Sequence, residues 1–233
     1  MRLNRFISLC GQASRRGADK IIAAGRITIN GELVKDFSYR VQTGDVVKLD
    51  GKTIAAPTQY TYLMLHKPVG CLSTAKDPRG RPTIYKYLPR DCKKMRYIGR
   101  LDFNSRGLLL LTDHGELLHR LTHPSYQVPR TYHVWTHEPM TLAHKKLILQ
   151  GVDIGEGQSS RPTKIKFSGL KSEITLTEGK NREIRRLMAA VGLEVTDLKR
   201  VSYAGLDLEP LGDGKFRFLT HTEIGQLYAM AKM

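Results

Sequence analysis

One aspartate, Asp102, stands between two arginines and just ahead of a run of four leucines. The run Leu108–Leu111 is typical of a short buried strand, so we expect Asp102 to lie in a loop that is held by the core and open at the surface. Arg100 and Arg106 are close in sequence, and nearby cations keep a carboxylate ionised. An ionised, partly desolvated carboxylate with no metal ligands around it suits a nucleophile better than a proton shuttle. On local sequence alone, an aspartate that caps the turn or pairs with a structural arginine is the simpler interpretation.

Two other segments place cations on regular elements. Residues 128–135 alternate like a strand, in which Tyr132 follows Arg130 and has the pattern of a half-buried sheet residue. Residues 183–191 have the apolar spacing of a helix, and their cations gather on another face. The cations of this segment and the loop before it are Lys180, Arg182, Arg185 and Arg186. On the sequence pattern alone, the simpler interpretation is that these cations form a basic helix face exposed to solvent, without a functional role.

Several catalytic and metal-binding patterns fail on spacing. Ser105 lies in a near miss to the G-x-S-x-G turn, because Phe103 stands where the first glycine belongs. Gly214-Lys215 lacks the upstream glycine of a phosphate-binding loop. The pairs His119/His123 and His133/His137 do not form H-E-x-x-H, so we expect no metal site.

Composition restricts the class of protein. The 233 residues include 38 Lys and Arg against 22 Asp and Glu, a formal net charge of +16, and 40% are hydrophobic, enough for a core. The excess predicts a polyanionic partner, and nucleic acid fits better than a membrane because no basic amphipathic helix of membrane type stands out. The longest apolar runs are too short to span a bilayer, and we expect no secretory signal. Three separated cysteines predict reduced thiols in a cytoplasmic protein.

The order of elements predicts two domains. Residues 1–55 read as two short helices followed by a hairpin at Asn30-Gly31, with Ser14 as N-cap of the second helix. Residues 56–60 form a linker, and residues 61–233 mix strands and helices without regular alternation. This pattern predicts an α+β fold with a mixed, mainly antiparallel sheet. Cations of the first domain that could grip phosphates are Arg15, Arg16, Lys20 and Arg26.

The motifs resemble those of a known enzyme family. Gly99-Arg100-Leu101-Asp102-x-x-Ser105-x-Gly107-Leu108-Leu109-Leu110-Leu111-Thr112 resembles the signature of the RsuA-type pseudouridine synthases, although that family usually has Thr where Ser105 stands. Lys67-Pro68-Val69-Gly70 resembles its first motif, Arg130-x-Tyr132 another, and residues 179–186 its third. The first domain is similar to the RNA-binding fold shared with the fourth small-subunit ribosomal protein.

This resemblance implies that a uridine in ribosomal RNA is isomerised to pseudouridine without a metal or other cofactor. Asp102 would attack the anomeric carbon or abstract a ribose proton, and the sequence leaves both open. Tyr132 would stack on the base, and Arg185, by its position in the third motif, would pair with Asp102. Stacking on an aromatic ring is a common way to hold an unstacked base.

The remaining expectations concern RNA contacts and partners. The residues expected to contact RNA are Arg15, Arg16, Lys20, Arg26, Lys67, Arg100, Arg106, Arg130, Lys180 and Arg182. The motifs look most like the branch that acts on large-subunit (23S) RNA, with the small-subunit (16S) branch as runner-up. A non-catalytic RNA-binding assembly factor is the alternative class. We expect a monomer whose partner is ribosomal RNA or an assembling ribosomal subunit.

Overall fold

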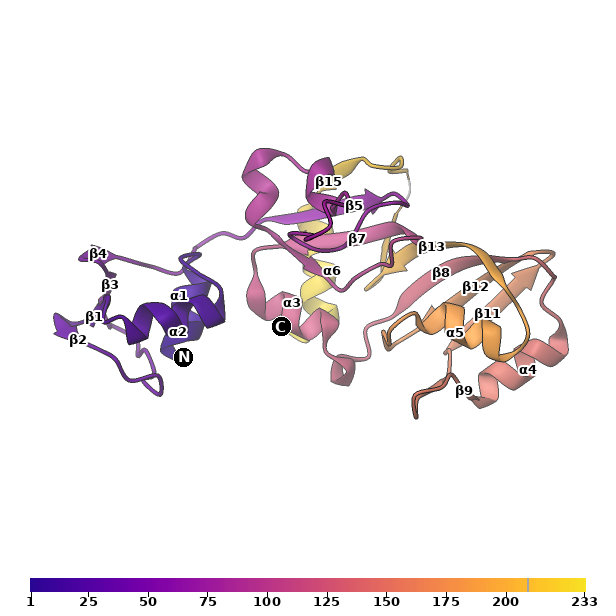
Figure 1. Cartoon of the computed structure of the whole chain (residues 1–233), viewed down its shortest axis with the longest axis horizontal. Helices are drawn as coiled ribbons and strands as arrows, with labels where there is room; N and C mark the ends of the chain where they lie inside the picture. The colour runs from indigo at the N-terminus through magenta and orange to yellow at the C-terminus, as the bar shows by residue number, and fades with distance from the viewer. Residues whose placement is uncertain (209) are drawn as a thin grey trace. The chain divides into compact units, whose positions relative to one another are not determined.

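The computed structural model describes residues 1–208 and 210–233 and, for residue 94, the backbone alone. These residues form two compact units, Met1–Tyr60 and Thr61–Met233 (Figure 1). Each unit has its own hydrophobic core. Across the described residues, no helix has the length and apolar character needed to cross a membrane.

The first unit contains two helices and a four-stranded antiparallel sheet in the order β2-β1-β3-β4. Ser14 caps the second helix as predicted, since its side chain accepts a hydrogen bond from the Gly17 amide at 3.1 Å. The predicted Asn30-Gly31 turn joins β1 to β2, and both residues have the positive φ that such a tight hairpin requires. The elements are α1 (Leu3–Leu9), α2 (Arg15–Ala23), β1 (Ile27–Ile29), β2 (Glu32–Leu33), β3 (Val47–Leu49) and β4 (Lys52–Thr53).

The second unit is built on a nine-stranded sheet. Its main order is β11-β12-β8-β13-β7-β5-β15, with β14 paired to β13 and β6 to β7. The pairing of β7 with β13 is parallel and the other pairings are antiparallel, which confirms the predicted α+β class. The strands are β5 (Tyr62–Lys67), β6 (Arg96–Ile98), β7 (Arg106–Thr112), β8 (Arg130–Thr136), β11 (Lys164–Ser168), β12 (Lys171–Leu176), β13 (Val195–Tyr203), β14 (Leu206–Asp207) and β15 (Phe216–Phe218). A separate small pair is β9 (Val152–Asp153) with β10 (Ser159–Ser160).

Helices cover the two halves of this sheet differently (Figure 1). On the half formed by β11, β12, β8 and β13, α4 and α5 contribute Ile148 and Leu187 to a core with Val134 and Ile174. On the half formed by β5 and β7, the short helical turns η1 and η2 enclose a second core. The helices are α3 (Gly115–Thr122), α4 (Leu142–Gln150), α5 (Glu183–Ala190), α6 (His221–Met230), η1 (Ile84–Tyr87), η2 (Arg90–Lys94) and η3 (Pro124–Tyr126).

A glycine fixes the approach of β7 to β13. Gly107 lies opposite Arg200 in the parallel pair and has a φ of +113°. A Cβ atom at this position would lie 2.2 Å from the Arg200 carbonyl oxygen, so no other residue fits without moving a strand. The loop that carries Asp102 enters β7 directly before this contact.

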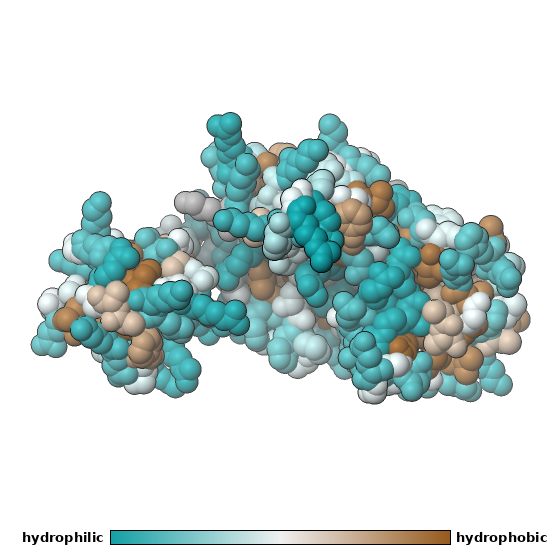
Figure 2. Space-filling view, in the orientation of Figure 1, coloured by the Kyte–Doolittle hydropathy of each residue, from teal (hydrophilic) through white to brown (hydrophobic). Residues whose placement is uncertain are grey.

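Hydrophilic residues cover most of the visible surface of each unit, as expected for a strongly charged chain (Figure 2). Hydrophobic residues reach the surface in small patches, one of them over α4, whose Leu142 and Leu147 are exposed. Scattered exposure of this kind is normal for a folded domain.

Candidate active site

Asp102 lies in the loop between β6 and β7, half-buried, as the leucine run predicted. It lines a cavity of about 300 Å³ together with Tyr132 from β8. Ser105 from the same loop and Arg200 from β13 also line it. The other cations in its wall are Arg100, Arg130, Lys180 and Arg182. The structure therefore brings residues of three separate sequence motifs to one cavity.

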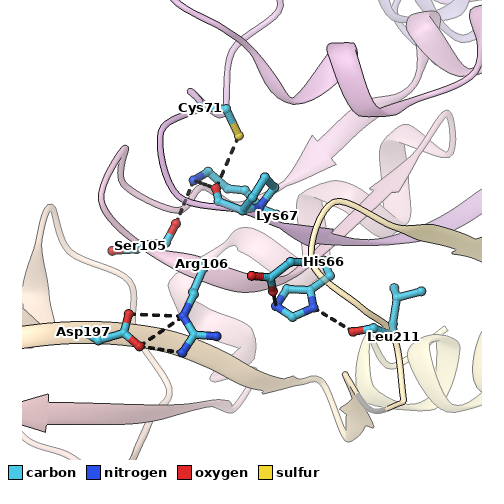
Figure 3. A network of polar contacts seen from close by, with 9 residues as sticks. His66, Lys67, Cys71, Ser105, Arg106, Asp197 and Leu211 are labelled. Atoms are coloured by element: carbon cyan, nitrogen blue, oxygen red, sulfur yellow. Dashed lines mark hydrogen bonds and ion pairs between the residues drawn. The ribbon is translucent and has the colours of Figure 1, made fainter.

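Lys67 holds the loop that carries Asp102, and Figure 3 shows its contact with Ser105 of that loop. Its side chain is fully buried at the end of β5, and Nζ donates hydrogen bonds to the carbonyls of Pro68 (3.0 Å), Asp102 (3.0 Å) and Ser105 (2.7 Å). Burial lowers the pKa of Lys67. The expectation that Lys67 contacts RNA is wrong for this structure, because its ammonium group is enclosed and faces the backbone of the protein itself.

Further bonds fix the shape of this loop. The Ser73 hydroxyl donates to the Leu101 carbonyl at 3.0 Å and accepts from the Leu101 amide at 3.2 Å. The Gly70 amide donates to the Phe103 carbonyl at 2.9 Å. Residues of the first motif thus hold the loop of the second, which is how the sequence between positions 67 and 73 bears on Asp102.

Arg185 lies elsewhere than predicted. Its Nη2 donates to the Asn104 carbonyl at 2.9 Å and its Nη1 to the Val195 carbonyl at 3.1 Å. No ion pair joins it to Asp102 among the residues that the structure describes. Burial, and next the charge of Arg182, lower the pKa of Arg185. Arg185 therefore holds the backbone beside Asp102 by hydrogen bonds, and the Asp102 carboxylate acts on it through its charge, which raises the pKa of Arg185 against the effect of burial.

Arg106 also departs from its expected position beside Asp102. Its Nη2 contacts an Asp197 carboxylate oxygen at 2.6 Å (Figure 3). Its guanidinium lies 5.6 Å from the centre of the Trp135 ring. Hydrogen bonds to Asp197 raise the pKa of Arg106. Trp135 and Tyr132 are three positions apart on β8, so they point to opposite faces of the sheet. Arg106 therefore lies on the face away from the cavity, whereas Arg100 is exposed and lines it.

The face of β8 and β13 that meets the cavity is rich in aromatic rings and cations. Tyr132 is 9% exposed and lies directly opposite Arg200 across the two strands. Arg130 is buried, with its guanidinium 5.2 Å from the centre of the Tyr203 ring, and that of Arg200 lies 5.0 Å from the same ring. Arg130 can therefore contact RNA only through a nucleotide that enters the cavity.

Arg200 is the site residue that sequence reasoning missed. Alternation along β13 could have placed it on one face with Leu198, because both are even-numbered positions of a strand. That signal does not identify which strand lies beside β13 or what lies above its face.

The other cations that we expected to contact RNA differ in their exposure and in their partners within the protein. Arg15, Arg16 and Lys20 are exposed on α2. Arg26 is exposed but bound to Asp50, with 2.9 Å between its Nε and a carboxylate oxygen. Lys180 donates to the Ser159 carbonyl at 2.6 Å and pairs with Glu178. Arg182 is exposed in the residue before α5. In the described part of the chain, His, Cys, Asp and Glu do not cluster in groups of three or more that could hold a metal ion.

Comparison with known proteins gives a consistent result. A family model described as RNA pseudouridylate synthase matches residues 61–190, and a model described as S4 domain matches residues 1–47. The chain is 35% identical to a ribosomal large subunit pseudouridine synthase B of Bacillus subtilis, over 99% of this chain and 96% of that protein. It is 39% identical to a protein of the same name from Shigella flexneri, over 89% and 75% of the two chains.

The fold agrees with a solved structure as well. A crystal structure of a pseudouridylate synthase superposes with a TM-score of 0.72 at 31% identity, covering 97% of this chain and 99% of the other. The match extends through both units.

Proposed function

This chain belongs to the family of RNA pseudouridylate synthases, and we propose that it isomerises a uridine of large-subunit ribosomal RNA with Asp102 as the reacting carboxylate. The observation that supports this most is the cavity that Asp102 and Tyr132 line together with five cations. Arg100 and Arg182 are exposed, Lys180 is half-buried, and Arg130 and Arg200 are buried. A cavity of about 300 Å³ has room for a single flipped base.

Four residues in and around the cavity receive a role in this proposal. The Asp102 carboxylate acts on the ribose, by attack on the anomeric carbon or by removal of a proton. Tyr132 stacks on the uracil while the ring is detached and turned. Lys67 and Arg185 act as positioning residues, since both donate to carbonyl groups of the loop that carries Asp102. A loop fixed in this way holds the carboxylate in place before substrate arrives, which lowers the barrier to reaction.

The choice of RNA rests on the relatives. Two of them are named ribosomal large subunit pseudouridine synthase B, and both align along most of this chain. We assign residues 1–55 to RNA docking, residues 56–60 to a linker and residues 61–233 to catalysis. Arg15, Arg16 and Lys20 are exposed on α2 and suited to phosphates. We propose that the protein is a cytoplasmic monomer that acts on ribosomal RNA or an assembling subunit.

The test is a map of pseudouridines across all ribosomal RNA from cells with and without this protein. The proposal predicts that one or a few sites of large-subunit RNA lose their pseudouridine when the protein is absent and regain it when the gene is restored. Loss confined to small-subunit RNA would overturn the substrate assignment. An unchanged map in every RNA would overturn the catalytic role.

A further inference from the structure

Two residues that line the cavity each carry a buried polar atom with no hydrogen-bond partner among the described residues. The atoms are Nη2 of Arg200 and Oγ of Ser105, in side chains that are 2% and 1% exposed. Buried polar groups are nearly always paired, because leaving one unpaired destabilises the folded protein. Because both residues line the same cavity, a molecule that enters it is the natural partner for both atoms.

The Arg200 side chain is rigidly held. Its Nε donates to the Leu108 carbonyl at 2.7 Å, and its guanidinium lies over the Tyr203 ring at 5.0 Å. The remaining N–H groups at Nη2 therefore have a fixed direction. Ser105 is held as well, since its carbonyl accepts the 2.7 Å hydrogen bond from Lys67.

The position of Arg200 relative to Tyr132 indicates what it meets. The two residues are opposite each other in the antiparallel pair β8–β13, so their side chains leave the sheet on one face from Cβ atoms about 5 Å apart. A pyrimidine that stacks on Tyr132 brings its edge to Arg200. The edge of uracil that can accept hydrogen bonds carries two carbonyl oxygens.

The reaction makes those oxygens more negative. When the bond between the anomeric carbon and the ring nitrogen breaks, its electron pair stays on the ring and spreads to the carbonyl oxygens. The electron-poor ribose then bonds to the Asp102 carboxylate or gives up a proton to it. In either case a uracil anion exists until its C5 bonds to the ribose, a step that releases the Asp102 carboxylate or returns the proton from it to the ribose. The hydrogen on C5 then leaves as a proton, and N1 takes one up. Fixed donors aimed at developing charge are the most effective kind of stabilisation in an enclosed site.

We propose that Arg200 Nη2 and Ser105 Oγ form a subsite that binds one carbonyl oxygen of the target uracil and stabilises the ring as it leaves, an inference that rests on the proposed function. The ligand of this subsite is a pyrimidine carbonyl, and its two donors come from the loop that carries Asp102 and from β13.

The experiment pairs enzyme variants with altered substrates. Synthetic RNAs carry uridine, 2-thiouridine or 4-thiouridine at the site found by the pseudouridine map, and sulfur accepts hydrogen bonds more weakly than oxygen. The proteins are the wild type, Arg200→Lys, Ser105→Ala and the control Ser172→Ala. Ser172 is also a buried serine, but it lies on β12 and does not line the cavity. Single-turnover rates at saturating RNA are measured for every pair.

We expect Arg200→Lys and Ser105→Ala to react about 10- to 100-fold more slowly with uridine, in line with the loss of one oxyanion donor. The decisive result is whether the effect of the protein substitution and the effect of sulfur in the substrate depend on each other. Sulfur at one of the two positions should slow the wild type and the control at least about fivefold more than it slows the two cavity variants.

Equal cost of sulfur in all four proteins, at both positions, would overturn the subsite. Should Arg200→Lys fail to fold, Ser105→Ala alone decides, because it removes only one hydroxyl oxygen. If the wild type does not convert uridine in any RNA, the proposed function fails and the subsite fails with it.

Discussion

The basic residues of the first unit and those around the Asp102 loop are of the same types, yet their surroundings differ. Arg15, Arg16 and Lys20 are exposed on α2. Lys67 and Arg200 are almost completely enclosed and donate to main-chain carbonyls. Only exposed cations such as Arg15, Arg16 and Lys20 can neutralise phosphates and release counterions from RNA. The enclosed set shapes a loop and a cavity, so a net charge of +16 overstates the charge available for binding RNA.

The largest expected effect comes from the enclosed set. Lys67→Met keeps the length of the side chain but leaves the carbonyls of Pro68, Asp102 and Ser105 without their donor. We expect a loss of about 3 kcal/mol in the free energy of unfolding and about a 100-fold fall in the single-turnover rate. RNA affinity should stay within about threefold of the wild type, because phosphates never reach Lys67. Urea unfolding, rate and binding measurements check these three values.

The matched control is Lys20→Met, which removes an exposed lysine. It should leave the unfolding free energy within about 0.5 kcal/mol of the wild type. If Lys67→Met weakened RNA binding and kept the full rate, the distinction between enclosed and exposed cations would be wrong.

A smaller effect is expected when the exposed set is neutralised. The triple variant Arg15→Gln/Arg16→Gln/Lys20→Gln should bind RNA about tenfold more weakly at 0.1 M salt, and its plot of log affinity against log salt should be shallower by about 2. The rate at saturating RNA should remain within about twofold of the wild type. A salt titration of RNA binding measures both the affinity at 0.1 M salt and the slope of log affinity against log salt. Lys146→Gln, at an exposed position of α4, is the control, and an equal effect there would show that position does not matter.

The smallest effect concerns a cation that is neither free nor enclosed. Arg217 makes two hydrogen bonds to Glu223, at 2.8 and 2.6 Å, in the first turn of α6. These bonds lower the pKa of Glu223 from 4.5 to about 2. Since the folded pKa is depressed, the stabilisation is complete above about pH 5 and is lost as the pH falls toward 2.

Glu223→Gln should therefore cost about 1 kcal/mol at pH 7 and almost nothing near pH 2. Urea unfolding at both pH values checks this. If the unfolding free energies of Glu223→Gln and the wild type differed by the same amount at both pH values, the charge of the ion pair would contribute nothing to stability.

Local patterns predicted much of the structure and much of the cavity. Ser14 at the start of a helix, Asn30-Gly31 in a hairpin and the loop position of Asp102 each follow from a few adjacent residues. The face of Arg106 and the partner of Arg185 do not, because both depend on a strand or carbonyl far away in sequence. Arg200 illustrates the limit, since its bond to the Leu108 carbonyl spans 92 positions. Which long side chain becomes enclosed depends on which strands pair in the folded sheet. Patterns of adjacent residues in a single sequence do not show which distant strands pair.

The most direct test of the proposed reaction is a single substitution, Asp102→Asn, in the full-length protein. It keeps the size and polarity of the side chain and leaves the hydrogen bond from Lys67 to the backbone carbonyl intact. With RNA that carries the mapped uridine, we predict single-turnover formation of pseudouridine at least about 10⁴-fold slower than in the wild type. RNA affinity should stay within about twofold. Pseudouridine formed by Asp102→Asn at a rate close to that of the wild type would contradict the role of Asp102.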